Sequence, residues 1–319
     1  RGVNGSKLRV FKLWLTRTRI GEQTTAALGA VLKSSQGLEN VVLGLGGTQV
    51  TDPSGAELFR HVNGSKLQVF QLWLNDTPVG TQTTAALGAV LKASQVLEDV
   101  ALSLEETQVD DPGAADMLRG VNGSKIRVFK LGLNNTLIAT QTTAALGAVL
   151  RASQILEDVQ LFLSATQVDD KSAADMLRGV NGSKIRVFSF GLRSTPVGTQ
   201  TTAALGAVLR TSQVLEDVVL DLGATQVDDK NAADMLRGVN GSKLRVFKLW
   251  LYSTPVGTQT TAALGAVLRT SQVLEDVVLD LGATQVDDKN AADMLRGVNG
   301  SKIRVFNLWL DGTPVGTQT

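Results

Sequence analysis

The sequence contains no cysteine and one histidine, His61, among 319 residues. Disulfide-stapled modules and thiolate metal sites are therefore excluded. The formal net charge is +1, so no strong field draws nucleic acid or anionic lipid toward the chain as a whole. No apolar run approaches the roughly 18 residues that span a bilayer. We therefore expect no nucleic-acid or membrane partner. The lack of cysteine permits a reducing compartment, and we expect a cytoplasmic location.

What the sequence does have is repetition. The stretch VFKLWLYSTPVG begins at Val246, and edited copies lie 59 residues apart. Each period divides into two similar halves of 30 and 29 residues. Such a period is typical of solenoids, in which one unit cannot bury its own apolar face and stacks on its neighbours. The other copies begin at Val10, Val69, Val128, Val187 and Val305.

The longer half predicts a strand followed by a helix. Residues 244–251 alternate: Phe247 and every second residue after it are apolar and are predicted to point inward, while Lys248 and Trp250 are predicted to point outward. This alternation indicates a strand with one buried face. Residues 260–269 carry apolar side chains at the spacing of one helical face. Thr260 or Thr261 is of the type that caps the start of a helix.

The shorter half repeats this order with another alternating strand and a shorter helix. The helix is predicted over residues 290–296, with Met294 and Leu295 buried. Gly297 and Gly300 are expected to end it, since glycine accepts the left-handed conformation found beyond helix ends. The Asn-Gly-Ser triplets there match a glycosylation acceptor, but we interpret them as helix-ending turns.

Strand and helix therefore alternate throughout, with about eleven strands and ten helices. Parallel strands stacked with helices behind them predict a right-handed α/β solenoid, in which the narrower strands line the concave side and the helices the convex side. We expect residues 1–319 to form a single solenoid of about five 59-residue double repeats plus a partial one. We find no evident capping units, so exposed ends should favour fraying or end-to-end self-association.

At this point the residues resemble leucine-rich-repeat proteins, specifically the ribonuclease-inhibitor-like subfamily. The pattern L-x-x-L-x-L-x-x-N-x-L-G, followed by two helix leucines, falls on Val246, Leu249, Leu251, Thr254, Val256, Gly257, Leu264 and Leu268. The resemblance implies a horseshoe-shaped solenoid that binds proteins.

Three departures from the family pattern follow. Threonine stands at the family's asparagine position, which predicts a weaker hydrogen-bond ladder. The family's helix glycine is Thr24 in the first copy and Thr260 in the fifth, and the first strand position is polar in the shorter halves. Leu38 and Leu97, two residues before that position, are expected to take over its packing.

Exposed strand positions differ most between copies. The inward phenylalanine never changes, whereas the outward positions change in chemistry and the helices change mildly. This contrast favours a binding surface on the concave face over unconstrained drift, although an indole could instead lie flat and shield neighbouring strands. The mixed charge suits a protein partner. The candidate partner-binding residues are Lys12, Trp14, Trp73, Lys130, Phe162, Asp221, Lys248, Trp250, Tyr252, Asp280 and Trp309.

No catalytic, cofactor or metal site is predicted. His61 occurs in one copy and is interpreted as a surface substitution for glycine. The paired carboxylates Glu98 and Asp99 recur in each of the three following periods and are interpreted as a scaffold feature. The preferred hypothesis is a non-enzymatic protein-recognition scaffold. The alternative is a ligand-sensing repeat fragment of a larger receptor or regulatory protein. An enzyme, such as the GTPase activators known in this family, is a third hypothesis for which no residue argues.

Overall fold

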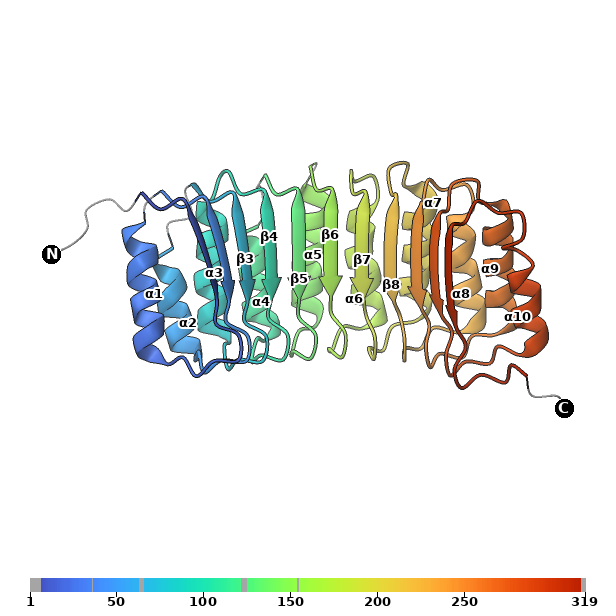
Figure 1. Ribbon diagram of the computed structural model, residues 1–319, viewed down its shortest axis with the longest axis horizontal. Coiled ribbons are helices and arrows are strands. Elements are labelled where there is room, and N and C mark those ends of the chain that lie inside the picture. Colours follow the sequence, from blue (N-terminus) through green and yellow to red (C-terminus); the bar gives the residue numbers. More distant parts are fainter. Residues whose placement is uncertain (1–6, 36, 63–65, 122–124, 154, 317–319) are drawn as a thin grey trace. The chain divides into compact units, whose positions relative to one another are not determined.

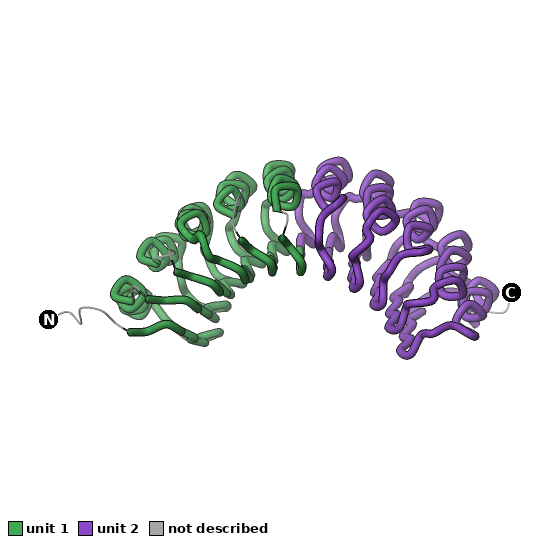
Figure 2. The backbone as a smooth tube through the Cα atoms, turned by 90° about the horizontal axis from the view of Figure 1, so that it is seen from above, with its two compact units in different colours: residues 1–161 green, residues 162–319 purple. Residues whose placement is uncertain are grey.

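The computed structural model describes residues 7–35, 37–62, 66–121, 125–153 and 155–316. The chain divides into two compact units, which we call unit 1, residues 1–161, and unit 2, residues 162–319 (Figure 2). In both units strands and helices alternate along the chain (Figure 1). Each unit is described by itself below.

The described residues of unit 1 form five helices, each preceded by a strand, and a last strand that follows the fifth helix. They are β1 Val10–Trp14, α1 Glu22–Ser34, β2 Asn40–Gly44, α2 Asp52–Arg60, β3 Val69–Trp73, α3 Thr81–Ala93, β4 Asp99–Ser103, α4 Asp111–Arg119, β5 Val128–Gly132, α5 Thr140–Ala152 and β6 Asp158–Phe162. Strand β6 ends on the first residue of unit 2.

Unit 2 continues the same alternation. Its elements are α6 Asp170–Leu177, β7 Val187–Gly191, α7 Thr199–Thr211, β8 Asp217–Asp221, α8 Asp229–Leu236, β9 Val246–Trp250, α9 Thr258–Thr270, β10 Asp276–Asp280, α10 Asp288–Leu295 and β11 Val305–Trp309. Short 3₁₀ turns, Arg178–Val180 and Arg237–Val239, follow α6 and α8.

Neighbouring strands within each unit are parallel and follow one another in chain order. In unit 1, Phe70 of β3 lies opposite Val41 of β2 and Val100 of β4. In each unit the helices cover one face of the sheet, and the strands lie on the inner side of that unit's bend (Figure 2). The predicted fold class, an α/β solenoid with a parallel sheet on one side and helices on the other, is therefore confirmed.

The core lies between the strands and the helices. Phe70, Phe129, Phe188 and Phe247 are at most 1% exposed, as the alternation predicted. Phe11 and Phe306 are half-buried, because β1 and β11 each pair with a single neighbouring strand in the described residues. Leu38 and Leu97 are 1% and 0% exposed, so the expected compensation for the polar first strand position is also confirmed.

The capping prediction for the longer helices is wrong. Helix α9 begins at Thr258, so Thr260 and Thr261 lie inside it and are buried. The cap comes instead from Asp229 at the start of α8, whose carboxylate accepts hydrogen bonds from the backbone N–H groups of Gly257, Gln259 and Thr260 at 2.8–2.9 Å. Neighbouring half-repeats are thus linked by a carboxylate at a helix N-terminus, where the helix dipole favours negative charge.

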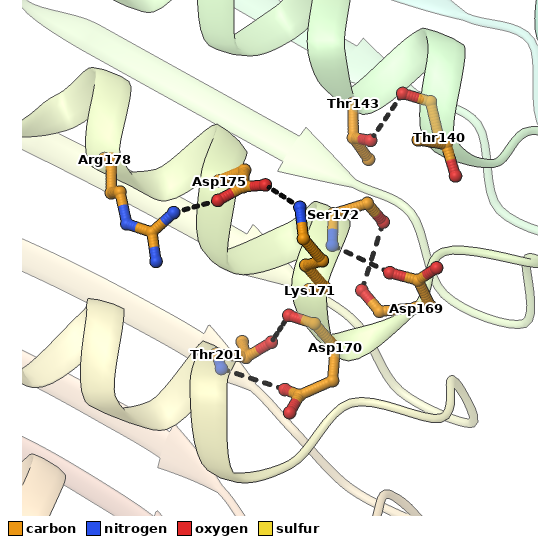
Figure 3. A network of polar contacts seen from close by, with 9 residues as sticks. All are labelled: Thr140, Thr143, Asp169, Asp170, Lys171, Ser172, Asp175, Arg178 and Thr201. Carbon is orange, nitrogen blue, oxygen red and sulfur yellow. Dashed lines mark hydrogen bonds and ion pairs between the residues drawn. The ribbon is translucent and has the colours of Figure 1, made fainter.

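The same cap recurs along the chain. Figure 3 shows it in unit 2, where Asp170 accepts from the backbone N–H of Thr201 at 2.9 Å. Burial alone would raise the pKa of these carboxyls, but the backbone and threonine hydroxyl bonds outweigh it and hold each pKa below its ordinary value. The four linking residues are Asp52, Asp111, Asp170 and Asp229.

The threonines at the family's asparagine position do not form a ladder between repeats, which corrects the expectation of a weakened one. Each hydroxyl donates to the carbonyl three residues earlier in its own turn, at 2.5–2.7 Å. Neighbouring turns are joined by backbone bonds instead, for example from Ala283 N–H to Asp311 O at 2.6 Å. The eleven threonines are Thr18, Thr48, Thr77, Thr107, Thr136, Thr166, Thr195, Thr225, Thr254, Thr284 and Thr313.

Two details of the shorter helix differ from prediction. Gly300 has the expected positive φ of +79°, but Gly297 does not; a Cβ there would lie 2.3 Å from the carbonyl oxygen of Gly265, so glycine serves close helix packing. Leu295 is 43% exposed, whereas Leu236 at the same place in α8 is 0% exposed. The difference arises because α10 is the last helix in the described part of the chain. Asn181, Asn240 and Asn299 are exposed, and Asn4, Asn63 and Asn122 lie outside the described residues.

Candidate functional site

The sheet of each unit has one face without helices, which we call the strand face. It carries the first, third and fifth residues of each strand and the second residue after each strand. Every predicted partner-binding residue lies on this face, because each occupies one of those positions. The alternation in the sequence predicted this placement, and no indole is sealed in the core. Whether these residues bind a partner stays a prediction.

In unit 1 two tryptophans meet across an intervening strand. The ring centroids of Trp14 on β1 and Trp73 on β3 lie 4.8 Å apart, with ring planes tilted by 39°. Gly44 of β2 lies between them in the register. A Cβ on Gly44 would come within 2.2 Å of the Trp14 ring, so the indole lies directly over this glycine. Trp14 therefore covers a neighbouring strand, as the alternative hypothesis stated. Its side chain still remains accessible to solvent, because Trp14 is 59% exposed.

The charged groups of the unit 1 face are partly neutralised. Lys130 lies 3.4 Å from Asp158 on the next strand, and Gln71 donates to Asp99 at 3.0 Å. Burial raises the pKa of Asp99, although the bond from Gln71 opposes that shift. Lys12 is exposed at the outer strand. Lys130, which the sequence presented as an open positive charge, is therefore engaged by its own chain.

In unit 2 carboxylates and indoles alternate at the fifth strand position. Asp221, Trp250, Asp280 and Trp309 lie side by side in the register of β8 to β11. Each aspartate accepts one hydrogen bond from the backbone two residues later, from Gly223 at 3.1 Å and from Gly282 at 2.9 Å. Burial raises the pKa of Asp221, and the negative charge of Asp280 adds to the rise. The bond from Gly223 and the charge of Arg193 oppose this rise.

The edge of the unit 2 face carries a guanidinium over an aromatic ring. The Arg193 Cζ atom lies 5.6 Å from the centroid of Tyr252, which is 41% exposed. Such contacts are attractive because the face of an aromatic ring is electron-rich. Lys248, in contrast, is paired with Asp276 at 3.3 Å. Phe162 is 36% exposed and Trp309 is 44% exposed.

Sequence reasoning missed several residues that shape this face. Arg193 contacts Tyr252, and Asp158 and Asp276 neutralise lysines. Gly44, in contrast, was recognised in the sequence as small enough for an indole to lie over it, and the structure places an indole there. The recurring acidic first strand position was visible in the sequence as a departure from the family pattern. Its pairing with a lysine two residues along the preceding strand could have been found only by aligning the strands in register.

A second feature lies on the helix side of unit 1. A groove of about 460 Å³ between α1 and α2 is lined in part by Gly29, Glu57 and His61. His61 Nε2 lies 2.8 Å from Glu57 Oε1. At the matching place after α4, a Cβ on Gly120 would lie 2.4 Å from the carbonyl oxygen of Gly88. His61 thus lies half-buried in a surface groove, which agrees with its interpretation as a surface substitution for glycine.

The described residues offer neither a metal cluster nor a membrane span. No group of three or more His, Cys, Asp or Glu side chains within them could hold a metal ion. No helix among them is long and apolar enough to cross a membrane. The predictions that the chain needs no cofactor and has no catalytic site stay predictions.

Comparison with known proteins gives two kinds of relative. The chain is 21% identical over 237 residues to ribonuclease inhibitor of Sus scrofa, covering 74% of this chain and 50% of that protein. It is 22% identical over 320 residues to NACHT, LRR and PYD domains-containing protein 12 of Homo sapiens, covering 100% of this chain and 29% of that protein. The chain thus spans half or less of the length of these curated relatives. No family model matches it.

Among solved structures, a chain from "Crystal structure of Rad7 and Elc1 complex in yeast" is similar with a TM-score of 0.47 and 14% identity, covering 92% of this chain and 75% of that one. The curated relatives include two ribonuclease inhibitors and two proteins with leucine-rich repeats in their names. Together with the alternating strands and helices, they confirm the resemblance of this chain to leucine-rich-repeat proteins of the ribonuclease-inhibitor-like subfamily.

Proposed function

We propose that this chain is a protein-recognition scaffold that binds a partner protein through its strand face. One observation carries the proposal: large aromatic side chains are exposed on a frame whose buried layer is nearly unchanged from copy to copy. Trp14, Tyr252 and Trp309 are 59%, 41% and 44% exposed. Aromatic residues of this kind dominate the binding energy of many protein interfaces.

The comparisons support a binding role without naming the partner. Ribonuclease inhibitor is, by its name, a protein that acts on another protein. The exposed part of the strand face mixes both charge signs with aromatic groups, which suits a protein better than a phosphate backbone. We accordingly propose no catalytic role, no nucleic-acid partner and a cytoplasmic location, with residues 1–319 acting as one solenoid.

The alternative is a ligand-sensing repeat fragment of a larger receptor or regulatory protein. Its support is the match over the whole chain to NACHT, LRR and PYD domains-containing protein 12, of which the chain covers 29%. Recovery of the full reading frame separates the two functions, because additional domains fused to the repeats are required by the second.

The test begins with capture of proteins from source lysate, followed by purification of the protein that is most enriched. Replacing Trp73 and Trp250 with alanine should weaken its binding at least about tenfold, or ~1.4 kcal/mol, with little change in melting temperature. A helix-face variant, Asp175→Asn with Asp234→Asn, serves as the control. Unaltered affinity in the tryptophan variant would rule out the strand face as the binding surface.

A further inference from the structure

Two carboxylates on the strand face of unit 2 have no cation of the described chain in salt-bridge contact, although the charge of Arg193 acts on Asp221 at longer range. Asp221 and Asp280 make no ion pair in the described part of the chain, and each uses one oxygen, Oδ1, to accept from a backbone N–H. Asp276, four residues before Asp280 on the same strand, is neutralised by Lys248 at 3.3 Å. The chain thus pairs Asp276 with a lysine, whereas Asp221 and Asp280 have no salt-bridge partner among the described residues. Among those residues, only the more distant charge of Arg193 opposes that of Asp221.

The two carboxylates lie on either side of an indole. Trp250 is the direct neighbour of Asp221 on β8 and of Asp280 on β10. Parallel strands are about 4.8 Å apart, so the backbones that carry the carboxylates are separated by roughly 10 Å. Both carboxylates are half-buried, which reduces solvent screening and raises the pKa of Asp221, and repulsion from the charge of Asp280 raises it further against the opposing charge of Arg193. A cation placed between them would relieve this repulsion.

We propose that this part of the strand face receives a basic side chain from a segment of a protein partner, seated over Trp250 between Asp221 and Asp280. The inference rests on the proposed function and specifies the chemistry of the partner. A guanidinium fits best, because its planar fork can donate to carboxylates on both sides while stacking on an indole. An ammonium group would reach one carboxylate at a time.

The edge of the same face shows that it accommodates such a group. Arg193 places its guanidinium 5.6 Å from the ring centroid of Tyr252, the second residue after β9. Arg193 forms no salt bridge with either aspartate, and its charge reaches Asp221 only at longer range, where it opposes the rise in the pKa of that carboxyl. A partner cation therefore has its own place beside Trp250, and charge complementarity selects a basic segment over an acidic or neutral one.

The experiment uses the full chain and a short synthetic peptide with arginines spaced by glycine and serine. Its counterpart carries citrulline, which keeps the shape of arginine and removes the charge. Binding is measured by calorimetry at low and at physiological ionic strength. The Asp221→Asn, Asp280→Asn double variant keeps an acceptor for Gly223 and Gly282, so it should fold, as melting will verify.

The arginine peptide should bind the wild-type chain, bind the double variant about tenfold more weakly, and lose affinity with added salt. The citrulline peptide should bind neither. The control variant Asp175→Asn, Asp234→Asn changes net charge equally on the helix side, in α6 and α8, and should stay within about twofold. Failure of the arginine peptide to bind wild type, or equal binding to the double variant, would overturn the inference.

The identified partner protein distinguishes this failure from failure of the proposed function. If its binding is weakened by the Trp73 and Trp250 substitutions but not by the aspartate double variant, the strand face binds a partner and the basic side chain is excluded. If neither variant changes its affinity, both proposals fail.

Discussion

The strand faces of the two units show how one residue between two tryptophans changes a surface. In unit 1, Gly44 separates Trp14 from Trp73, and the rings meet at 4.8 Å over it. In unit 2, Asp280 occupies the same register position between Trp250 and Trp309, and no ring contact joins these two indoles in the described residues. Unit 1 thus presents a continuous aromatic platform, whereas unit 2 presents isolated indoles beside carboxylates.

Beneath the strand faces the two units have the same buried phenylalanine layer. The largest loss of stability is expected when one of these phenylalanines is removed. Phe70→Ala in unit 1 and Phe247→Ala in unit 2 should each destabilise the chain by ~3–5 kcal/mol, because both rings are fully buried. Denaturant unfolding measures the loss, with Lys12→Ala as the surface control. A clear difference between the two phenylalanine variants would show that the units differ below the surface as well.

Removing a linking carboxylate should cause the next largest loss of stability, and the loss should be equal in the two units. Asp111→Ala removes the cap of α5 and Asp229→Ala that of α9, and each should cost about 2 kcal/mol, the upper range for a helix cap. Asp234→Ala removes exposed pairs with Lys230 at 2.9 Å and with Arg237 and should cost much less than either cap, because solvent screens exposed pairs. Equal losses in all three variants would contradict the capping role.

The same carboxylates predict a direction for acid sensitivity. Their pKa values are lowered in the folded chain, so their stabilisation is complete above the ordinary value of about 4 and is lost as pH falls through the lower folded values. Unfolding free energy followed from neutral to strongly acidic pH should therefore decline less steeply for Asp111→Asn than for wild type. A steeper decline would mean that the sign is wrong.

A smaller effect should follow from exchanging the intervening residue. Gly44→Asp places a Cβ where the Trp14 ring lies, 2.2 Å from its nearest atom, so the indole must swing away. Because Trp14 is exposed, stability should change by no more than about 1 kcal/mol. The circular dichroism couplet of the stacked indoles should disappear, and Asp280→Gly should not weaken it. Persistence of the couplet in Gly44→Asp would refute the overlap of ring and glycine.

The smallest expected effect is a change in the pKa of Asp221. Burial raises its pKa and the charge of Asp280 raises it further, so ionisation of Asp221 reduces folding stability as pH rises through the raised value. In Asp280→Asn the pKa of Asp221 should move down toward its ordinary range. Carbon-detected NMR titration of the carboxyl groups measures this, and an unchanged or higher pKa would contradict the coupling.

Much of this arrangement could be predicted from the sequence. The period of two in each strand segment placed Phe247 inward and Trp250 outward, and the helical spacing identified the buried face of α9. The capping residue could not be found this way, because Thr260 has the right residue type for a cap, while Asp229 is distant along the chain. The predicted burial of Leu295 was wrong for a related reason. Burial at this position depends on a following helix, and the periodicity of the helix that carries Leu295 contains no information about that neighbour.

The sequence by itself determined the fold class and which side chains face away from the helices, because alternation and the 59-residue period act locally and repeat. Only the tertiary structure decided what those side chains meet. Register brings Trp14 over Gly44, pairs Lys248 with Asp276, and leaves Asp221 and Asp280 without a salt-bridge partner in the described residues. Such contacts join residues about thirty positions apart, and their geometry is fixed by strand pairing rather than by any local pattern.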